Sequence, residues 1–575
     1  MGRSALGRRL LLVMHAVRQI GRAVLARLYA SPLYRWRLRG NEPERLLIAP
    51  QDLRAADPTR AAELVEGRFS FAGKTLDLAS VSPFAINPPS PAWSETLHGF
   101  AWLRHLRAAD SAAGRRTARQ LVGDYVRSGA HLRRAALDPA VAARRVLSWL
   151  AQAPLALDGA DRGFHRAFLR SLVFQTNYLL RAGPIGRDGL TRLTAAIAAA
   201  QASLCLPDKL GLRRPATRWL MAELNRQVLP DGVHIGRNPQ SALELLLDLL
   251  PLRQSFAARD LPAPAELLGA IDRMMPMLRF FRHGDGAFAA FNGMSYTQTH
   301  LVATLLVYDD SRGRPMQNAP HGGYQRAESG GSVLIIDTGR PPPLAESGEA
   351  HAGALAFEFS ADNTRLIVNC GAPPPGREGW RQLARATVAH STAVVGETSS
   401  SRFVGSRLWR GLLGRPILTG PSTIPVERRE DGTGVRLAAS HDGYAGAFGL
   451  VHRRELQLMP DGALFGRDYF LDRNGQPWAG KGAAMLRFHI HPAVNARLAE
   501  GEDLVVLDLP GGRSWVFQAV GGTMRLAESV HLANPEGPRR TMQILLGPPG
   551  QGEEARGMAW SLEPAPPPDE PDAAS

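Results

Sequence analysis

Apolar and polar residues follow two different rhythms along this chain. Between about residues 93 and 307, apolar residues recur every three or four positions, which is the spacing of one helix face. Ala and Leu dominate this part, and the pattern predicts helices at residues 117–126, 141–152, 164–180, 190–204, 217–227, 241–250 and 264–281. Many successive helices of similar length are typical of a helical solenoid or a closed α/α toroid.

The rhythm changes near Pro320, where short β-rich runs bounded by Gly, Pro, Asn and Asp replace the helical spacing. These runs predict strands at 333–337, 354–359, 365–369, 391–395, 449–458, 463–471, 484–490, 503–509, 515–519 and 541–546. Strands this short and this frequent predict an antiparallel β-sandwich. An earlier segment, residues 67–74, also alternates and predicts a strand or hairpin.

The chain has 575 residues, which favours two large domains over one. We expect a basic amphipathic leader at residues 1–60, a helical α/α toroid at 61–318 and a β-sandwich at 319–563. The remaining residues, 564–575, are Pro-rich and acidic, a composition that cannot bury a core, so we expect a disordered tail.

The leader is basic and amphipathic. Residues 1–30 contain no acidic residue and six arginines, namely Arg3, Arg8, Arg9, Arg18, Arg22 and Arg27. In a helix, one face would carry Val13, Val17, Ile20, Val24 and Leu28, while most of the arginines would lie elsewhere. Such a helix suits an anionic membrane surface. The alternatives are a helix packed on its own domain, a disordered leader and a cleavable export signal, although the cleavage-site pattern is lacking.

The net charge of +15 is carried almost entirely by arginine, because lysine occurs only at Lys74, Lys209 and Lys481. A basic surface attracts polyanions such as nucleic acid, anionic lipid or acidic polysaccharide. No basic groove with interleaved aromatic residues is evident, so we expect no specific nucleic-acid partner. The two cysteines, Cys205 and Cys370, fall in different predicted domains, so a disulfide is not expected.

A polar loop at residues 231–240 precedes a predicted helix and brings His234, Arg237 and Asn238 close together. Histidine can move protons near neutral pH, and arginine can hold a carboxylate. The alternative is a plain turn in which Asn238 and Pro239 begin the helix.

Further polar residues mark the entries and ends of three predicted strands. Glu349 and His351 precede one strand, Asn369 ends the next, and Arg385 and His390 precede a third. Histidine and oxygen ligands from neighbouring strands can converge on zinc, usually with a carboxylate among them. The alternative is a set of hydrogen-bonded structural residues.

Taken together, the segments 231–239, 246–250, 350–359, 366–371 and 385–392 resemble the heparinase II/III family. The resemblance extends over about residues 65–560 and is most specific at 320–400. It implies an α/α toroid followed by a β-sandwich, with a cleft between them. It also implies a lyase that cuts uronate-containing polysaccharide by β-elimination and, from the usual place of the family, a location in the cell envelope or periplasm.

The resemblance also implies roles for single residues, and several positions depart from the family pattern. The catalytic first His of the family's His-x-His element falls on Glu349, and the second falls on His351. The family's zinc ligands Asp and His fall on Asn369 and His390, so zinc is a candidate cofactor with a weakened ligand set. The family's toroid Tyr would lie near residues 240–241 and its Asn-His element near 189–190, and both are missing.

We therefore expect His234, Arg237, Glu349 and His351 to act in catalysis. We expect Asn238, Tyr324 and Arg385 to bind substrate, and the candidate metal ligands are His351, Asn369 and His390. The first functional hypothesis is a lyase that acts on an acidic polysaccharide. The second is a catalytically impaired glycan-binding or envelope-assembly protein on the same scaffold, because loss of an acid or base costs a lyase several orders of magnitude in rate.

Overall fold

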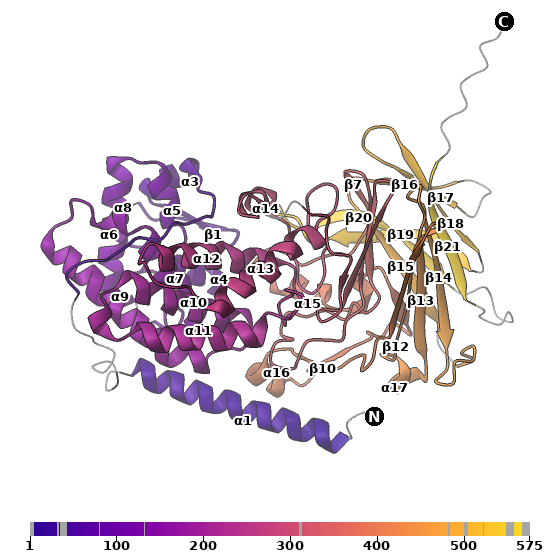
Figure 1. The fold of residues 1–575 in the computed structure, drawn as a ribbon, viewed down its shortest axis with the longest axis horizontal. Coiled ribbons are helices and arrows are strands. Elements are labelled where there is room, and N and C mark those ends of the chain that lie inside the picture. The colour runs from indigo at the N-terminus through magenta and orange to yellow at the C-terminus, as the bar shows by residue number, and fades with distance from the viewer. Residues whose placement is uncertain are drawn as a thin grey trace, which may run out of the picture.

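The structure is a computed structural model that describes residues 5–31, 34, 43–79, 81–130, 133–309, 313–480, 483–499, 504–520, 522–547 and 557–565. A helical half is followed by a β half along the long axis of the molecule (Figure 1). The predicted order, an α/α toroid followed by an antiparallel β-sandwich, is confirmed. The last strand reaches Pro564, and residues 566–575 of the predicted tail lie outside the described residues.

The toroid contains successive helices joined by short loops, with one hairpin near its start. Aspartate or serine caps several of the helices; Asp138, for example, accepts a hydrogen bond from the Ala140 N–H and is followed by Pro139 at the first helical position. The helices are α3 (Pro58–Val65), α4 (Pro91–Gly99), α5 (Leu103–Ala108), α6 (Ala112–Arg127), α7 (Pro139–Ala151), α8 (Ala153–Leu157), α9 (Arg162–Ala182), α10 (Leu190–Cys205), α11 (Arg213–Gln227), α12 (Gln240–Ala257), α13 (Ala265–Phe280) and α14 (Thr299–Leu306), and the hairpin is β1 (Arg68–Phe71) with β2 (Lys74–Asp77).

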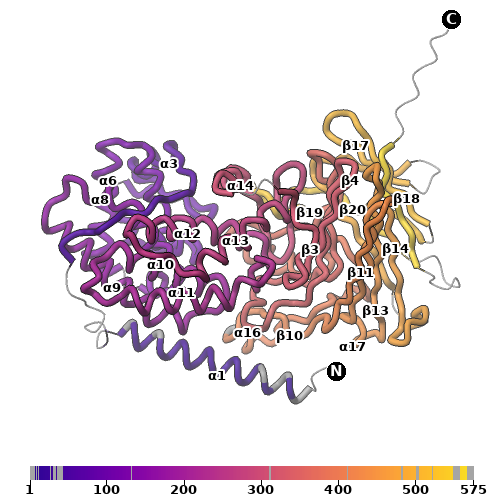
Figure 2. The backbone as a smooth tube through the Cα atoms, in the orientation of Figure 1, coloured from indigo at the N-terminus to yellow at the C-terminus, as the bar shows by residue number. Residues whose placement is uncertain are grey.

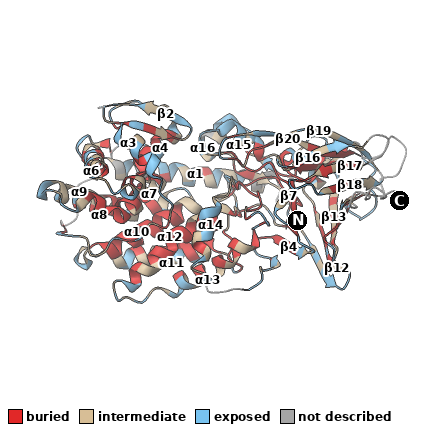
Figure 3. Ribbon diagram, turned by 90° about the horizontal axis from the view of Figure 1, so that it is seen from above, coloured by how far each residue is buried: buried red, intermediate tan, exposed pale blue. Residues whose placement is uncertain are grey.

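Helix α10 lies at the centre of the toroid and packs against α7, α11 and α12. Residues 192–205 are all buried, and six of the fourteen are alanine, so neighbouring helices can approach closely on every side (Figure 3). The core reaches back to Leu53, so the end of the predicted leader belongs to the toroid. It also extends into the first sheet at Tyr324 and Ile335, which joins the two domains through one apolar interior.

The sandwich consists of two antiparallel sheets. One has the order β11-β12-β13-β14-β21-β18-β17-β16, and the other has the order β19-β20-β15-β7-β6-β5-β4-β3 with β8 paired to β15. The strands of the sandwich and its flanking pair are β3 (Asn318–Ala319), β4 (Tyr324–Ser329), β5 (Ser332–Asp337), β6 (Phe357–Ala361), β7 (Thr364–Val368), β8 (Ala393–Val395), β9 (Arg402–Phe403), β10 (Ile417–Thr419), β11 (Val426–Asp431), β12 (Gly434–His441), β13 (Val451–Leu458), β14 (Leu464–Leu471), β15 (Ala484–Ile490), β16 (Asn495–Leu498), β17 (Leu504–Asp508), β18 (Ser514–Val520), β19 (Thr523–His531), β20 (Arg539–Gly547) and β21 (Met558–Pro564).

Alternation along the strands fills the space between the sheets. In β13 and β14 every second residue is buried, and the inward aromatic residues stack, as Phe357 does on Trp560 with ring centroids 5.5 Å apart. Three short helices lie outside the sheets: α15 (Glu378–Ala384), α16 (Arg407–Leu413) and α17 (Ala445–Phe448). Helices α15 and α16 lie at the side of the sandwich that faces the toroid (Figure 1).

Helix α1 (Ala5–Ala30) runs along the outside of the molecule and crosses the junction of the two domains (Figures 1 and 2). It packs by its polar face: the Arg22 guanidinium pairs with the Asp188 carboxylate at 2.6 Å, and both side chains are nearly buried. Its opposite face exposes an apolar stripe, defined by Leu10, Val13, Met14, Val17, Ile20, Val24 and Leu28. An amphipathic helix that packs on its own domain would normally bury this stripe. The side chains of Arg3, Arg8 and Arg9 lie outside the described residues.

Two further features concern the cysteines and the lengths of the helices. Cys205 and Cys370 are both buried free thiols. Among the described residues, no helix is long and apolar enough to cross a membrane.

Candidate functional site

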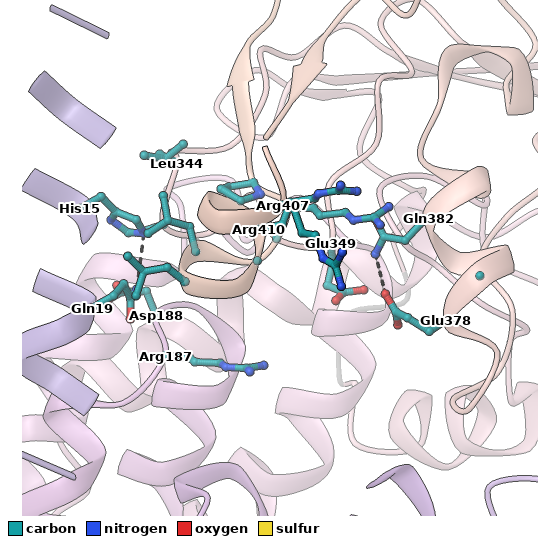
Figure 4. A pocket seen from close by; sticks show the side chains of 18 of the residues that line it. His15, Gln19, Arg187, Asp188, Leu344, Glu349, Glu378, Gln382, Arg407 and Arg410 are labelled. Atoms are coloured by element: carbon teal, nitrogen blue, oxygen red, sulfur yellow. Dashed lines mark hydrogen bonds between the residues drawn. The ribbon is translucent and has the colours of Figure 1, made fainter. Parts of the chain in front are cut away.

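A cavity of about 1380 Å³ lies where the toroid, the sandwich and α1 meet (Figure 4). Helix α1 contributes His15 and Gln19 to its wall, and the loop before α10 contributes Arg187 and Asp188. Loop 344–349 and helices α15 and α16 form the remaining sides. Other lining residues are Trp380, Leu383, Arg407, Arg410, Leu412 and Arg415. This cavity occupies the domain junction, where the sequence resemblance implies a cleft.

Glu349 is the one predicted site residue that lines this cavity. Its side chain is 61% exposed, and its Oε2 accepts a hydrogen bond from Nη1 of Arg381 at 2.6 Å. Unlike an imidazole, a carboxyl group carries no positive charge in either of its protonation states. At the position where the sequence resemblance implies a catalytic histidine, Glu349 thus supplies a group with different chemistry.

Arg237 lies inside the domain junction, with all of its N–H groups turned to protein acceptors. Its Nε donates to the Gly322 carbonyl at 2.6 Å, and its two terminal nitrogens donate to the carbonyls of residues 323, 339 and 340 and to the Asp337 carboxylate. Only 6% of the residue is exposed, and a φ of 62° holds its backbone in the left-handed region. A substrate carboxylate could reach this guanidinium only after these bonds had broken.

Tyr324 and Asn292 connect Arg237 to the predicted metal ligands. The Tyr324 hydroxyl donates to the Arg237 carbonyl at 2.6 Å and accepts a hydrogen bond from Asn292 Nδ2 at 2.7 Å. Burial raises the pKa of this hydroxyl above its usual value. Asn292 also donates to Asp337, and its Oδ1 accepts from the His351 backbone N–H at 3.2 Å. Asn292 is not among the residues predicted from the sequence, because a lone Asn before Gly293 resembles an ordinary turn.

His234 of the toroid and Arg385 of the sandwich are also engaged in hydrogen bonds within the protein. His234 is buried, and its Nε2 lies 2.9 Å from Gln227 Oε1 while its Nδ1 accepts from the Gly236 N–H at 3.1 Å. Burial and then nearby Arg226 lower the pKa of His234 to about 4, so it is neutral at pH 7. Arg385 is buried and donates to the carbonyls of Ala350 and Ser347 at 2.8 and 3.0 Å.

The Asn238 side chain lies just before α12 and bonds to its first residue. Its Oδ1 accepts a hydrogen bond from the Gln240 N–H at 2.9 Å, at the start of α12. This is the structural alternative that the polar loop allowed, with Asn238 and Pro239 beginning a helix. The substrate-binding roles assigned to Asn238, Tyr324 and Arg385 stay predictions.

The candidate zinc ligands do not form a suitable set. His351 Nδ1 and His390 Nε2 lie 3.0 Å apart, in hydrogen-bonding contact, and His390 Nδ1 lies 2.9 Å from the Ala386 carbonyl. The Asn369 amide donates to Glu358 Oε1 at 3.1 Å and accepts from the Ser391 N–H at 3.0 Å. Two neutral imidazoles and an engaged amide supply no anionic ligand. Among the described residues, no group of three or more His, Cys, Asp and Glu is arranged to hold a metal.

The cavity arginines are the residues that sequence reasoning did not find. Arg407, Arg410 and Arg415 lie close together in the sequence, but Arg187 lies more than 200 residues earlier, so no local motif joins all four. Their only signal was the segment 407–413, in which arginine and leucine alternate around Trp409.

The toroid, the sandwich and the cavity at their junction define a protein of the heparinase II/III type. Residues 311–561 match the family described as Heparinase II/III-like, C-terminal. The chain is similar to the crystal structure of heparinase III, with a TM-score of 0.70, 12% identity, and coverage of 89% of this chain and 86% of that one. It is also similar to a mutant of the heparan sulfate lyase HepC from Pedobacter heparinus, with a TM-score of 0.62, 15% identity and coverage of 96% and 90%.

A relative at higher identity is FtsZ-localized protein C of Caulobacter vibrioides, which is 31% identical over 548 residues, 93% of each chain. The chain belongs to the heparinase II/III family. The likeness to the solved lyases, at 12–15% identity, concerns the fold alone.

Proposed function

We propose that this protein is a non-catalytic member of the heparinase II/III family that docks on an anionic membrane surface through α1 and acts at the site of cell division. The observation that carries the proposal is the exposed apolar stripe of α1. The helix is already formed and held by the Arg22–Asp188 pair, so docking would not have to order it first.

The stripe has the composition of an interfacial helix. Each of its seven large apolar side chains is at least 47% exposed, and Arg18 and Arg27 are exposed on the same helix. Full burial of one such side chain contributes about 1.5–3 kcal/mol, and each Arg near an anionic surface adds about 1 kcal/mol. Contact between the apolar stripe and a lipid surface would therefore stabilise the docked protein, with α1 lying on the membrane and not spanning it.

The name of the relative supports the place of action. The similarity to FtsZ-localized protein C covers 93% of both chains. A partner or location shared with that relative would therefore not depend on a domain that this chain lacks. The engaged state of Arg237 and Tyr324 supports a role without catalysis, since neither group is available to a substrate without local opening.

Vesicle binding tests the proposal. We expect the purified protein to co-sediment with vesicles that contain phosphatidylglycerol, and the double substitution Val17→Asp/Ile20→Asp to weaken this binding at least 100-fold. Two apolar contacts are lost and two charges oppose the surface, and each 1.4 kcal/mol is a factor of ten. Val520→Asp, at an equally exposed position of the sandwich, is the matched control and should bind as the wild type does. Wild-type affinity in the α1 variant would rule the proposal out, and recruitment of FtsZ to the same vesicles would extend it.

The second candidate function is β-elimination on an acidic, uronate-containing polysaccharide in the cell envelope. The cavity with Glu349 and several arginines favours it, because the reaction must neutralise a carboxylate, remove the C5 proton and protonate the leaving oxygen. Glu349 would then be the base, with His234, His351 and Arg237 assisting and Asn238, Tyr324 and Arg385 binding the chain.

A lyase assay separates the two candidates. Incubation with a panel of acidic polysaccharides is expected to give no ultraviolet absorbance from unsaturated uronate, because the cavity offers a carboxylate in place of the family's histidine. A product that forms with the wild type and disappears with Glu349→Gln would establish the second candidate. The same panel analysed for binding alone would show whether a glycan is retained without turnover.

A further inference from the structure

The cavity behind α1 carries an excess of positive charge. Arg187, Arg407, Arg410 and Arg415 line it, and none of them forms an ion pair with another residue that the structure describes. The acidic residues of the wall are mostly neutralised by other arginines: Asp188 by Arg22 and Arg192, and Glu349 by Arg381. Glu378 alone has no cationic partner among the described residues and accepts instead from Gln382 at 2.6 Å.

When α1 is docked on a membrane, the position of the cavity relative to α1 determines how far these arginines lie from the lipid headgroups. His15 and Gln19, on the inner face of α1, form part of its wall, and α16 contacts α1 directly (Figure 4). An α-helix with its side chains is about 10 Å wide. The headgroup region of one leaflet is about 5–8 Å thick, and an interfacial helix lies at the boundary between headgroups and acyl chains. The groups directly behind α1 would therefore lie at the level of the lipid phosphates.

We propose that this cavity binds the phosphate groups of anionic phospholipids, with Arg407 and Arg410 of α16 as the main ligands and Arg187 and Arg415 beside them. The inference rests on the proposed membrane docking of α1 and names the lipid group that it recognises. Guanidinium groups suit phosphate oxygens because they donate two parallel hydrogen bonds.

Helix α16 also exposes apolar side chains, as expected of an element that contacts lipid. Leu408 and Leu412 lie one turn apart on one face and are 79% and 36% exposed, next to the two arginines. An acidic polysaccharide or peptide would use the same guanidinium groups but gives no reason for the exposed leucines. A phospholipid satisfies both, since its phosphate and its acyl chains are joined.

Charge-neutral substitution of the two α16 arginines tests the inference. In the full-length protein we expect Arg407→Gln/Arg410→Gln to lower the affinity for phosphatidylglycerol vesicles about 10–30-fold. Binding to phosphatidylcholine vesicles, in which each phosphate is already paired with a choline cation, should fall less, because it depends mainly on the α1 stripe. Arg436→Gln/Arg467→Gln removes the same charge from the outer face of the sandwich, at a second, distant groove, and should leave both affinities as they are.

The outcomes separate this inference from the function it rests on. If Val17→Asp/Ile20→Asp abolishes binding while Arg407→Gln/Arg410→Gln matches the distant control, the phosphate site is wrong and the docking helix stands. If the wild type binds no vesicles at all, both fail.

A soluble probe gives a second readout. Short-chain dihexanoyl phosphatidylglycerol, used below its micelle concentration, should change the fluorescence of Trp380 in the cavity wall, and a Trp380→Phe variant identifies that signal. The change should disappear in Arg407→Gln/Arg410→Gln. Loss of polyuronate binding in that variant, with lipid binding intact, would assign the arginines to an acidic glycan and overturn the inference.

Discussion

Arg237→Gln is expected to lower the free energy of unfolding by about 3–5 kcal/mol, because it leaves the buried Asp337 carboxylate without its cation. The guanidinium also satisfies four backbone carbonyls, and its plane lies over the Tyr324 ring with the Cζ atom 4.7 Å from the ring centre. Urea denaturation of the variant and the wild type measures the difference. Arg340→Gln, at an exposed position three residues after Asp337, is the matched control and should change stability by less than about 0.5 kcal/mol.

This experiment also decides between two interpretations of the polar loop at 231–240. A structural Arg237 predicts that Arg237→Lys loses most of the stability too, since an ammonium group cannot make the forked set of bonds. A substrate-binding Arg237 predicts normal stability together with weakened binding of acidic glycan. The second result would contradict the network of hydrogen bonds around Asp337.

The regular parts of the fold could be predicted because their patterns are local. Helix α10 was expected at 190–204 and spans Leu190–Cys205, and strand β15 was expected at 484–490 and has those bounds. Strand β11 (Val426–Asp431) was missed because it is an edge strand whose residues, VERRED, are mostly charged and exposed. An edge strand need not bury one face, so its sequence carries no alternation of apolar residues.

The sequence indicated which residues of the candidate site are important, but it did not indicate which partners their side chains contact. The loop motif identified Arg237 as important, but its partner Asp337 is 100 residues later at the end of β5, and the sequence contains no mark of that pairing. The pair His351 and His390 was expected to be close and lies in hydrogen-bonding contact. Asn369 was expected beside them as a ligand, and its amide contacts Glu358, a strand residue that was not among the candidate site residues.

The orientation of α1 is a further property that periodicity cannot supply. The spacing of Val13, Val17 and Ile20 predicts a stripe, but the same stripe suits a helix that buries it or one that exposes it. The choice depends on the polar face, where Arg22 finds Asp188 in a loop more than 160 residues away. One long-range ion pair thus distinguishes a helix that belongs to the core from a helix that is available to a surface.

Acid is expected to destabilise the protein strongly between pH 6.5 and about pH 4, because several histidines are buried in the neutral form. Burial lowers the pKa to about 4 for His98, His234, His390 and His531 and to about 3 for His489. The unfolded chain binds these protons near pH 6.5 and the folded chain does not, so the stabilisation is complete above pH 6.5 and is lost as the pH falls toward 4. Five such groups give a slope of up to about 7 kcal/mol per pH unit near pH 5.

Urea denaturation at pH 7, 6 and 5 measures this slope. Substitution of a single histidine should remove the contribution of that histidine to the slope. His98 packs against the rings of Phe84 and Tyr125, with centroids 5.6 and 5.9 Å away, and its Nδ1 has no hydrogen-bond partner among the described residues. His98→Phe should therefore keep the fold and reduce the slope by about 1.4 kcal/mol per pH unit, the contribution of one proton. A stability that stays level from pH 7 to pH 5 would mean that these imidazoles reach water in the folded protein, which would leave His351 and His390 open to a substrate as well.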